Sequence, residues 1–223
     1  MSYYNIDDPY IYDLEVYKNL FLAGFHHIRS GKRFHLELSP RKQERNELLT
    51  FLKTQPTLIG FNNLTYDYRL LEEFIRIMLK YPNTSTKNTV EYLKKKSDVI
   101  IGNRLGKPRN KPVIPQIDLF LIHHYDRLNC SLKHLEFAMR MENVQTLPYA
   151  YDAILTDEQI QNVVDYNNND LDTTLKFYRK SIDEIKSRFD SSHIYKHDMM
   201  NMASPYMGET IFKIILTKEY GTS

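Results

Sequence analysis

The stretch Ile11-Tyr12-Asp13-Leu14-Glu15-Val16-Tyr17 contains the pattern that decides the fold. Tyrosines and branched aliphatic residues occupy most of its positions, which is typical of a β-strand. Residues i and i+2 of a strand point to the same face, so Asp13 and Glu15 are predicted to project side by side. Neighbouring carboxylates repel each other and lose hydration when buried. A divalent cation such as Mg²⁺ or Mn²⁺ would offset that cost, and the alternative is an edge strand with a solvated acidic face.

The composition is that of one folded domain, or of one domain with an insertion. The 223 residues are 42% hydrophobic and 13% aromatic, which is enough for a sizeable core. The net charge is +2, so any nucleic-acid-binding surface has to be local. Cys130 is the single cysteine, which excludes an internal disulfide and fits a reducing, intracellular compartment such as the cytoplasm.

Several classes of protein are not indicated by this sequence. No signal peptide is predicted, and no apolar run approaches the about 20 residues of a membrane span. With 7 glycines and no glycine-rich phosphate loop, a P-loop or dinucleotide-binding enzyme is not expected. The histidines His123, His124 and His134 lack the spacing and partners of a zinc site. No Ser/His/Asp or Cys/His pattern is visible.

The order of the elements predicts an α/β fold. The predicted strands are residues 10–17, 20–29, 33–38 and 57–61, and the predicted helices between or after them are residues 41–53 and 66–80. Short turns make the first three strands antiparallel neighbours, whereas the apolar run at 57–61 is typical of a buried parallel strand. Strands followed by helix–strand–helix predict a mixed sheet flanked by helices.

Residues 81–116 differ in composition from the segment before them. Between Lys87 and Lys111 there are two acidic residues and eight basic ones, namely Lys87, Lys94, Lys95, Lys96, Arg104, Lys107, Arg109 and Lys111. Prolines and glycines in the same stretch predict that most of it is loop. It is either a solvated insertion or an arm that contacts phosphates. In the second case, neutralising Lys94, Lys95 and Lys96 is expected to weaken binding to nucleic acid.

Regular structure is expected again after residue 116. A short strand runs into a helix that Asp118 caps, Ser131 caps a helix at 132–141, and Thr156-x-x-Gln159 resembles a capping box. A long helical region at 157–189 is predicted to kink at Asn167-Asn168-Asn169, where helix propensity is low. Residues 191–223 are predicted to be a helical extension, with a helix at 209–218.

Two further polar clusters follow the Asp13-x-Glu15 pair. One is the stretch from Gly60 to Asp67, where a buried strand meets a helix, and the other runs from Tyr166 to Asp170 on a helix. Residues i and i+4 of a helix share a face, so Tyr166 and Asp170 point the same way. Asp165 and Asp172 lie on other faces of that helix and are predicted to be solvated. Each cluster alone is weak, but the three in this order are much more specific.

Together these motifs resemble the DEDD superfamily of 3′→5′ exonucleases in its tyrosine subclass, and especially the proofreading exonuclease domain of family B DNA polymerases. The matching motifs are Asp13-x-Glu15, Asn62-x-x-x-Tyr66-Asp67 and Tyr166-x-x-x-Asp170, and the resemblance spans about residues 8–185. It implies an RNase H-like (DnaQ-like) fold with a mixed five-stranded sheet. It also implies an exonuclease domain at residues 1–190 that carries the basic insertion 81–116.

The resemblance further implies roles for individual residues. Asp13, Glu15, Asp67 and Asp170 would hold two Mg²⁺ or Mn²⁺ ions, with Asp13 bridging them, and Tyr166 would orient the attacking water. At its ordinary pKa of about 10 this tyrosine is a poor base, so positioning is favoured over proton abstraction. Substrate contacts are expected from the residues Leu14, Phe61, Asn62, Lys94, Lys95 and Lys96.

The implied reaction is the release of nucleoside monophosphates from single-stranded 3′ ends, of DNA in preference to RNA. The chain would be the exonuclease region of a longer polymerase, a nuclease that works beside replication partners, or a stand-alone nuclease. Two alternatives stay open, namely a stand-alone exoribonuclease and a non-catalytic nucleic-acid-binding module with the same fold.

Overall fold

The first three strands form the antiparallel part of the central sheet. The computed structural model describes residues 3–103, 111–123, 130–141 and 144–221. Its first strands are β1 (Tyr10–Tyr17), β2 (Leu20–His27) and β3 (Arg33–Leu38), each antiparallel to the next. The three predicted strands and their pairing are thus confirmed, although β2 ends at His27. The two-residue turn Lys18-Asn19 fixes the register between β1 and β2.

Two short parallel strands complete the sheet. They are β4 (Leu58–Gly60) and β5 (Gln116–Asp118), and the strand order is β3-β2-β1-β4-β5. The structure is therefore an α/β fold with a mixed five-stranded sheet, as predicted. Among the described residues, β4 pairs with β1 through Tyr10 and Ile11 alone. Asp13 and Glu15 consequently lie on a part of β1 beyond the end of the β4 ladder.

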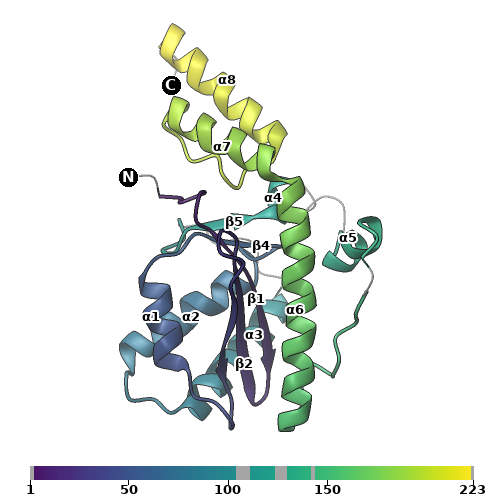
Figure 1. The fold of residues 1–223 in the computed structure, drawn as a ribbon. Coiled ribbons are helices and arrows are strands. Elements are labelled where there is room, and N and C mark those ends of the chain that lie inside the picture. The colour runs from purple at the N-terminus through teal and green to yellow at the C-terminus, as the bar shows by residue number, and fades with distance from the viewer. Residues whose placement is uncertain (1–2, 104–110, 124–129, 142–143, 222–223) are drawn as a thin grey trace.

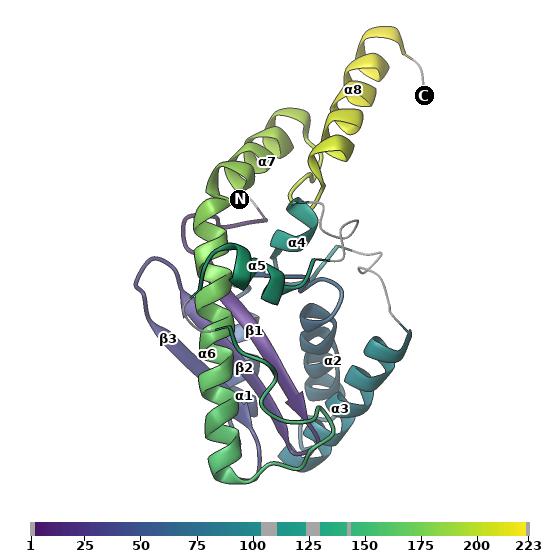
Figure 2. The same ribbon diagram turned by 90° about the vertical axis from the view of Figure 1, so that its right-hand side faces the viewer.

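Helices cover both faces of this sheet (Figures 1 and 2). The helices α1 (Arg45–Lys53), α2 (Asp67–Lys80) and α3 (Thr86–Asn103) lie on one face, and α6 (Asp157–Lys180) crosses the other. Side chains of β1 alternate between the two sides, because Tyr12, Leu14 and Val16 belong to the core on the α2 side. Ile11 packs on the opposite side with Leu171 of α6.

The basic segment contains a long helix, and the prediction that most of it is loop was wrong. Helix α3 occupies residues 86–103 because its apolar residues Val90, Leu93 and Ile100 recur at helical spacing and are buried. The prolines that suggested a loop, and Gly106, come only after this helix, and Gly102 lies in its last turn. The part of the predicted loop at 104–110 lies outside the described residues.

Helix α6 is continuous, so the prediction of a kink at residues 167–169 was also wrong. The break comes later, at Ser181, between α6 and α7 (Ile182–Tyr195). The three asparagines each find a partner outside the helix: Asn167 donates to Asp13, Asn169 donates to Glu136, and Asn168 accepts from Arg33. These tertiary hydrogen bonds offset the low helix propensity of asparagine.

The predicted caps are confirmed. The Asp118 side chain accepts from the backbone N–H of Phe120 at 3.0 Å and begins α4 (Leu119–Ile122). Ser131 caps α5 (Leu132–Ala138), which is shorter than expected, and Thr156 with Gln159 forms the capping box of α6. Asp118 also accepts from the backbone N–H groups of Asn62 and Leu64, and therefore fixes the turn after β4.

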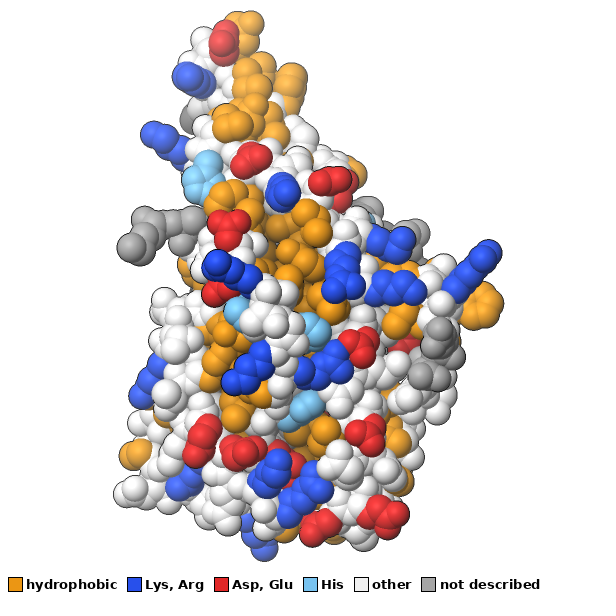
Figure 3. All heavy atoms as spheres, in the orientation of Figure 1, with side chains coloured by type: hydrophobic (Ala, Val, Ile, Leu, Met, Phe, Trp, Pro, Cys, Tyr) orange, Lys and Arg blue, Asp and Glu red, His pale blue; other side chains and the backbone are white. Residues whose placement is uncertain are grey.

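The last two helices extend away from the sheet (Figures 1 and 2). The second of them, α8 (Ser204–Tyr220), begins earlier than predicted, and the expected boundary at residue 190 falls within α7. Apolar side chains of α8, such as Phe212 with 62% of its surface exposed, form an orange band at the top of Figure 3. None of the described helices combines the length and the hydropathy that a membrane span requires.

Arg188 joins α7 to the segments around it. Its fully buried guanidinium donates to the backbone oxygens of Ile122, Glu184 and Met202 and to the hydroxyl of Ser204. A buried acceptor that loses its donor costs about 1–3 kcal/mol. Arg188 is thus a structural residue that ties α4, α7 and the start of α8 together.

We predict that Arg188→Met lowers the free energy of unfolding by ~3 kcal/mol, because several buried carbonyls lose their donor together. Urea denaturation followed by circular dichroism measures the change. Arg76→Met is the matched control, since Arg76 lies 57% exposed in a surface pair with Glu73 and should contribute ~0–1 kcal/mol. Equal losses in the two variants would contradict the role of Arg188.

Candidate metal centre

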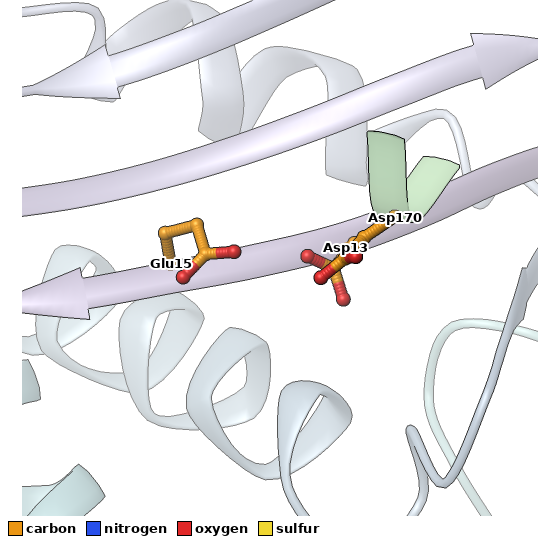
Figure 4. A group of neighbouring side chains, drawn as sticks. All are labelled: Asp13, Glu15 and Asp170. Atoms are coloured by element: carbon orange, nitrogen blue, oxygen red, sulfur yellow. The ribbon is translucent and has the colours of Figure 1, made fainter. Parts of the chain in front are cut away.

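Three carboxylates from two elements meet on one face of the sheet (Figure 4). Asp13 and Glu15 come from β1 and Asp170 comes from α6, and one oxygen of each lies within 4.8 Å of the others. The prediction that Asp13 and Glu15 project to the same side is confirmed. Carboxylate oxygens at this spacing are the donor set that hard divalent cations prefer. The three acids could hold a metal ion.

The packing of α6 buries this acidic cluster. Leu171 of α6 fits against the sheet beside Ile11, which places Asp170 over β1. Glu15 is only 7% exposed and Asp170 only 9%, while Asp13 is half-buried. The centre is therefore a partly closed site, and its charges are not those of a solvated acidic face.

The electrostatics of the cluster favour a cation. Burial, followed by repulsion from the neighbouring carboxylates, raises the pKa of Asp13 and Glu15 well above their usual ranges. Burial, with a further contribution from Glu136, raises the pKa of Asp170 to about 7. In the described part of the chain, none of the three carboxylates forms a salt bridge. The charge of Lys133 acts on Asp170 and opposes the rise in its pKa, and a bound divalent cation would stabilise all three carboxylates.

Asp67 is the fourth acid of the predicted set, and it lies beside the other three without belonging to the tight group. It is the first residue of α2 and is 7% exposed. Burial is the main cause that raises its pKa to about 8, while the backbone of Leu14 hydrogen-bonds to its carboxylate and opposes the shift. Its charge also acts on Asp13 and Glu15. Strand β1, the start of α2 and helix α6 thus bring all four acids into one electrostatic cluster.

Tyr166 lies one helical turn before Asp170, and the two side chains influence each other's pKa. Burial, and then the charges of Asp170, Glu15 and Asp13, raise the pKa of its phenol further above the ordinary value. The hydroxyl therefore keeps its proton at neutral pH. It can donate a hydrogen bond, but it is a poor general base.

The three other predicted contact residues differ in their burial and in the side chains that surround them. Leu14 is buried in the core on the opposite face of β1 from Asp13 and Glu15. Phe61 is half-buried at the end of β4, with its ring 5.3 Å from that of Phe120. Asn62 adopts a positive φ of 60° in the turn that follows, and its side chain accepts from the hydroxyl of Thr65 at 2.6 Å.

The three predicted lysines do not all share one surface, because consecutive residues of α3 point in different directions. Lys94 is buried, pairs with Asp98 and lies over the ring of Tyr151 at 4.6 Å. Lys95 is exposed, and it lines, together with Lys94, a cavity of about 770 Å³ between α3 and the β1–β2 turn. Lys96 is half-buried, 3.7 Å from the carboxylate of Glu73.

Sequence reasoning missed two polar residues beside the cluster. Asn167 donates from Nδ2 to Oδ2 of Asp13 at 2.7 Å, and Glu136 of α5 accepts from Asn169 at 2.9 Å while its charge acts on Asp170. The sequence did contain a signal that could have identified Asn167. Asn167 interrupts a buried stripe of α6 made of Ile160, Val163 and Leu171, and a polar residue in such a stripe needs a partner.

No protein-family model, curated protein or solved structure matches this chain. The interpretation of the site consequently depends on its own geometry and charge.

We predict that the acidic cluster of the metal-free protein contributes more to stability as the pH falls from about 8 towards the ordinary aspartate pKa of about 4. A carboxyl whose pKa is higher in the folded than in the unfolded chain binds its proton more tightly when folded, so protonation favours folding. Asp170→Asn should raise the melting temperature in EDTA at pH 8, weaken this pH dependence, and reduce the stabilisation by Mn²⁺. Thermal denaturation with Mn²⁺ or EDTA measures all three effects.

The matched control is Asp165→Asn, an exposed aspartate five residues earlier on the same helix. It should leave both the pH dependence and the response to Mn²⁺ as in the wild type. A wild-type melting temperature that Mn²⁺ leaves unchanged would contradict the metal centre.

Proposed function

We propose that this protein is a metal-dependent 3′→5′ exonuclease of the DEDD type, with an RNase H-like fold, that releases nucleoside monophosphates from single-stranded ends. The observation that carries the proposal is the approach of Asp13, Glu15 and Asp170 to within 4.8 Å, with Asp67 beside them. These residues come from the three motifs of the exonuclease resemblance, which are far apart in the sequence. Their gathering at one buried place is what that resemblance requires.

The donor set fits divalent cations. Four clustered acids, none with a salt bridge in the described residues, would release their protons and bind Mg²⁺ or Mn²⁺ as carboxylates. We propose that the site would hold two ions. Asp13, Glu15 and Asp170 would bind one of them, and Asp13 with Asp67 would bind the other. Bound cations of this kind supply positive charge that activates a water nucleophile and stabilises the leaving 3′ oxygen.

The remaining groups of the chain would orient the reactants. The phenol of Tyr166 lies one helical turn from Asp170 and would direct a water molecule toward a phosphate. The ring of Phe61, half-buried at the end of β4, offers a surface on which a terminal base could stack. DNA is proposed over RNA from the resemblance to polymerase domains, and so is a role beside or within a replication polymerase.

We predict that the protein shortens a 5′-labelled single-stranded oligonucleotide from its 3′ end with Mn²⁺ or Mg²⁺, and does nothing in EDTA. Asp13→Ala should reduce cleavage to background while it leaves the circular dichroism spectrum unchanged. Asp165→Ala, which removes an exposed aspartate, should cleave like the wild type. A DNA and an RNA strand of one sequence, compared on denaturing gels, identify the preferred sugar. Binding of ends without shortening would instead support a non-catalytic module.

We also predict that Tyr166→Phe lowers kcat about 10- to 100-fold without changing the shape of the pH–rate profile between pH 6 and 9. The reason is that the raised pKa keeps the phenol protonated throughout this range, so its loss removes a donor and not a titrating base. Steady-state rates at saturating metal and substrate, measured across the pH range for both proteins, test this. If the variant lost an ionisation that the wild type shows, Tyr166 would be acting as the base.

A further inference from the structure

A row of three residues crosses the sheet next to the acidic cluster. In the strand register Asp13 of β1 lies opposite Gly24 of β2, and Gly24 lies opposite His35 of β3. The side chain of Asn167 of α6 lies directly over the glycine. It is completely buried and extends from the Asp13 carboxylate toward the imidazole of His35.

The two ends of the Asn167 amide have different surroundings. Nδ2 donates to Oδ2 of Asp13 at 2.7 Å. Oδ1 of Asn167 and Nε2 of His35 are both buried, and among the described residues neither has a hydrogen-bond partner. Burial, followed by the charge of Arg33, lowers the pKa of His35, so its imidazole is neutral and does not place a positive charge beside the amide.

The amide can occupy this place only because residue 24 has no side chain. A Cβ atom at Gly24 would lie 1.9 Å from Oδ1 and 3.0 Å from Cγ of Asn167. Gly24 is in the middle of a strand, where glycine weakens the strand and often marks a close approach of another group. Here the close approach is that of the Asn167 amide.

We propose that Asn167 is a positioning residue for Asp13, and that Gly24 is required because it makes room for the Asn167 amide. This inference deepens the proposed function and rests on it. One oxygen of Asp13 is held by the amide, which fixes the rotamer of a carboxylate that approaches Glu15 and Asp170 to within 4.8 Å. Hydrogen bonds of this kind to a metal-binding carboxylate commonly control metal affinity.

An asparagine suits this role because its amide is a neutral donor. A lysine or arginine would pair with Asp13 and neutralise the charge that a cation needs. Another carboxylate would add repulsion to an already crowded cluster. The amide donates at every pH at which the protein is folded, so it orients Asp13 without competing for the ion.

The test compares Asn167→Leu, Asn167→Ala, Gly24→Ala and the double variant Gly24→Ala/Asn167→Ala with the wild type. Leucine keeps the approximate volume of asparagine over Gly24 but removes the hydrogen-bond donor. Gly24→Ala instead keeps every polar group of the chain but displaces the Asn167 amide. Gly208→Ala is the control for the alanine change, since a Cβ there meets no atom within 4 Å. The readouts are Mn²⁺ affinity from electron paramagnetic resonance of free Mn²⁺, kcat and KM on an oligonucleotide, and the melting temperature.

We expect Asn167→Leu and Gly24→Ala each to weaken Mn²⁺ binding about 10- to 100-fold, with excess Mn²⁺ restoring most of kcat while KM for the oligonucleotide stays within about threefold. In the Asn167→Ala background, Gly24→Ala should have less than a threefold further effect, because the atom it displaces is gone. Gly208→Ala should match the wild type.

Wild-type Mn²⁺ affinity in Asn167→Leu would overturn the positioning role while leaving the proposed function intact. Absence of Mn²⁺ binding by the wild type itself would overturn both. Loss of activity that excess Mn²⁺ does not restore, in a variant with unchanged Mn²⁺ affinity, would show that Asn167 acts on the fold and not on Asp13.

Discussion

The contact between α6 and the face of β1 and β2 is the interaction on which the rest of the site depends. Leu171 and its apolar neighbours anchor the helix to the sheet, and the same contact presses Asp170 and Tyr166 onto the acids of β1. The apolar burial that stabilises the fold therefore also removes water from like charges. Each gain in packing at this interface raises the electrostatic cost of keeping these carboxylates charged.

Much of the fold follows from local signals in the sequence. The three antiparallel strands, the buried parallel strand and the caps at Asp118, Ser131 and Thr156 were predictable, because each depends on neighbouring residues. Two predictions failed where neighbouring residues were a poor guide. Composition averaged over residues 81–116 hid the regular apolar spacing of α3, and the low helix propensity of three asparagines is offset by partners that are distant in the sequence.

The candidate site divides in the same way. The common direction of Asp13 and Glu15, and that of Tyr166 and Asp170, follows from strand and helix periodicity. The meeting of the two pairs does not, because it depends on how α6 crosses the sheet. The role of Asn167 could not be predicted from the sequence, because it depends on the strand register that places Gly24 beneath this side chain. The different surroundings of Lys94, Lys95 and Lys96 could be predicted only with the knowledge that these residues lie on a helix.

The shortness of β4 has a consequence for access. This strand leaves β1 after Ile11, and the start of α2 takes up the adjoining space, with Asp67 hydrogen-bonded to the backbone of Leu14. If β4 were two residues longer, its pairing with β1 would continue past Ile11 and would occupy the space in which Asp67 now lies. Lengthening this one strand would therefore separate Asp67 from the other acids and disrupt the site, although all four acids would still be present in the sequence.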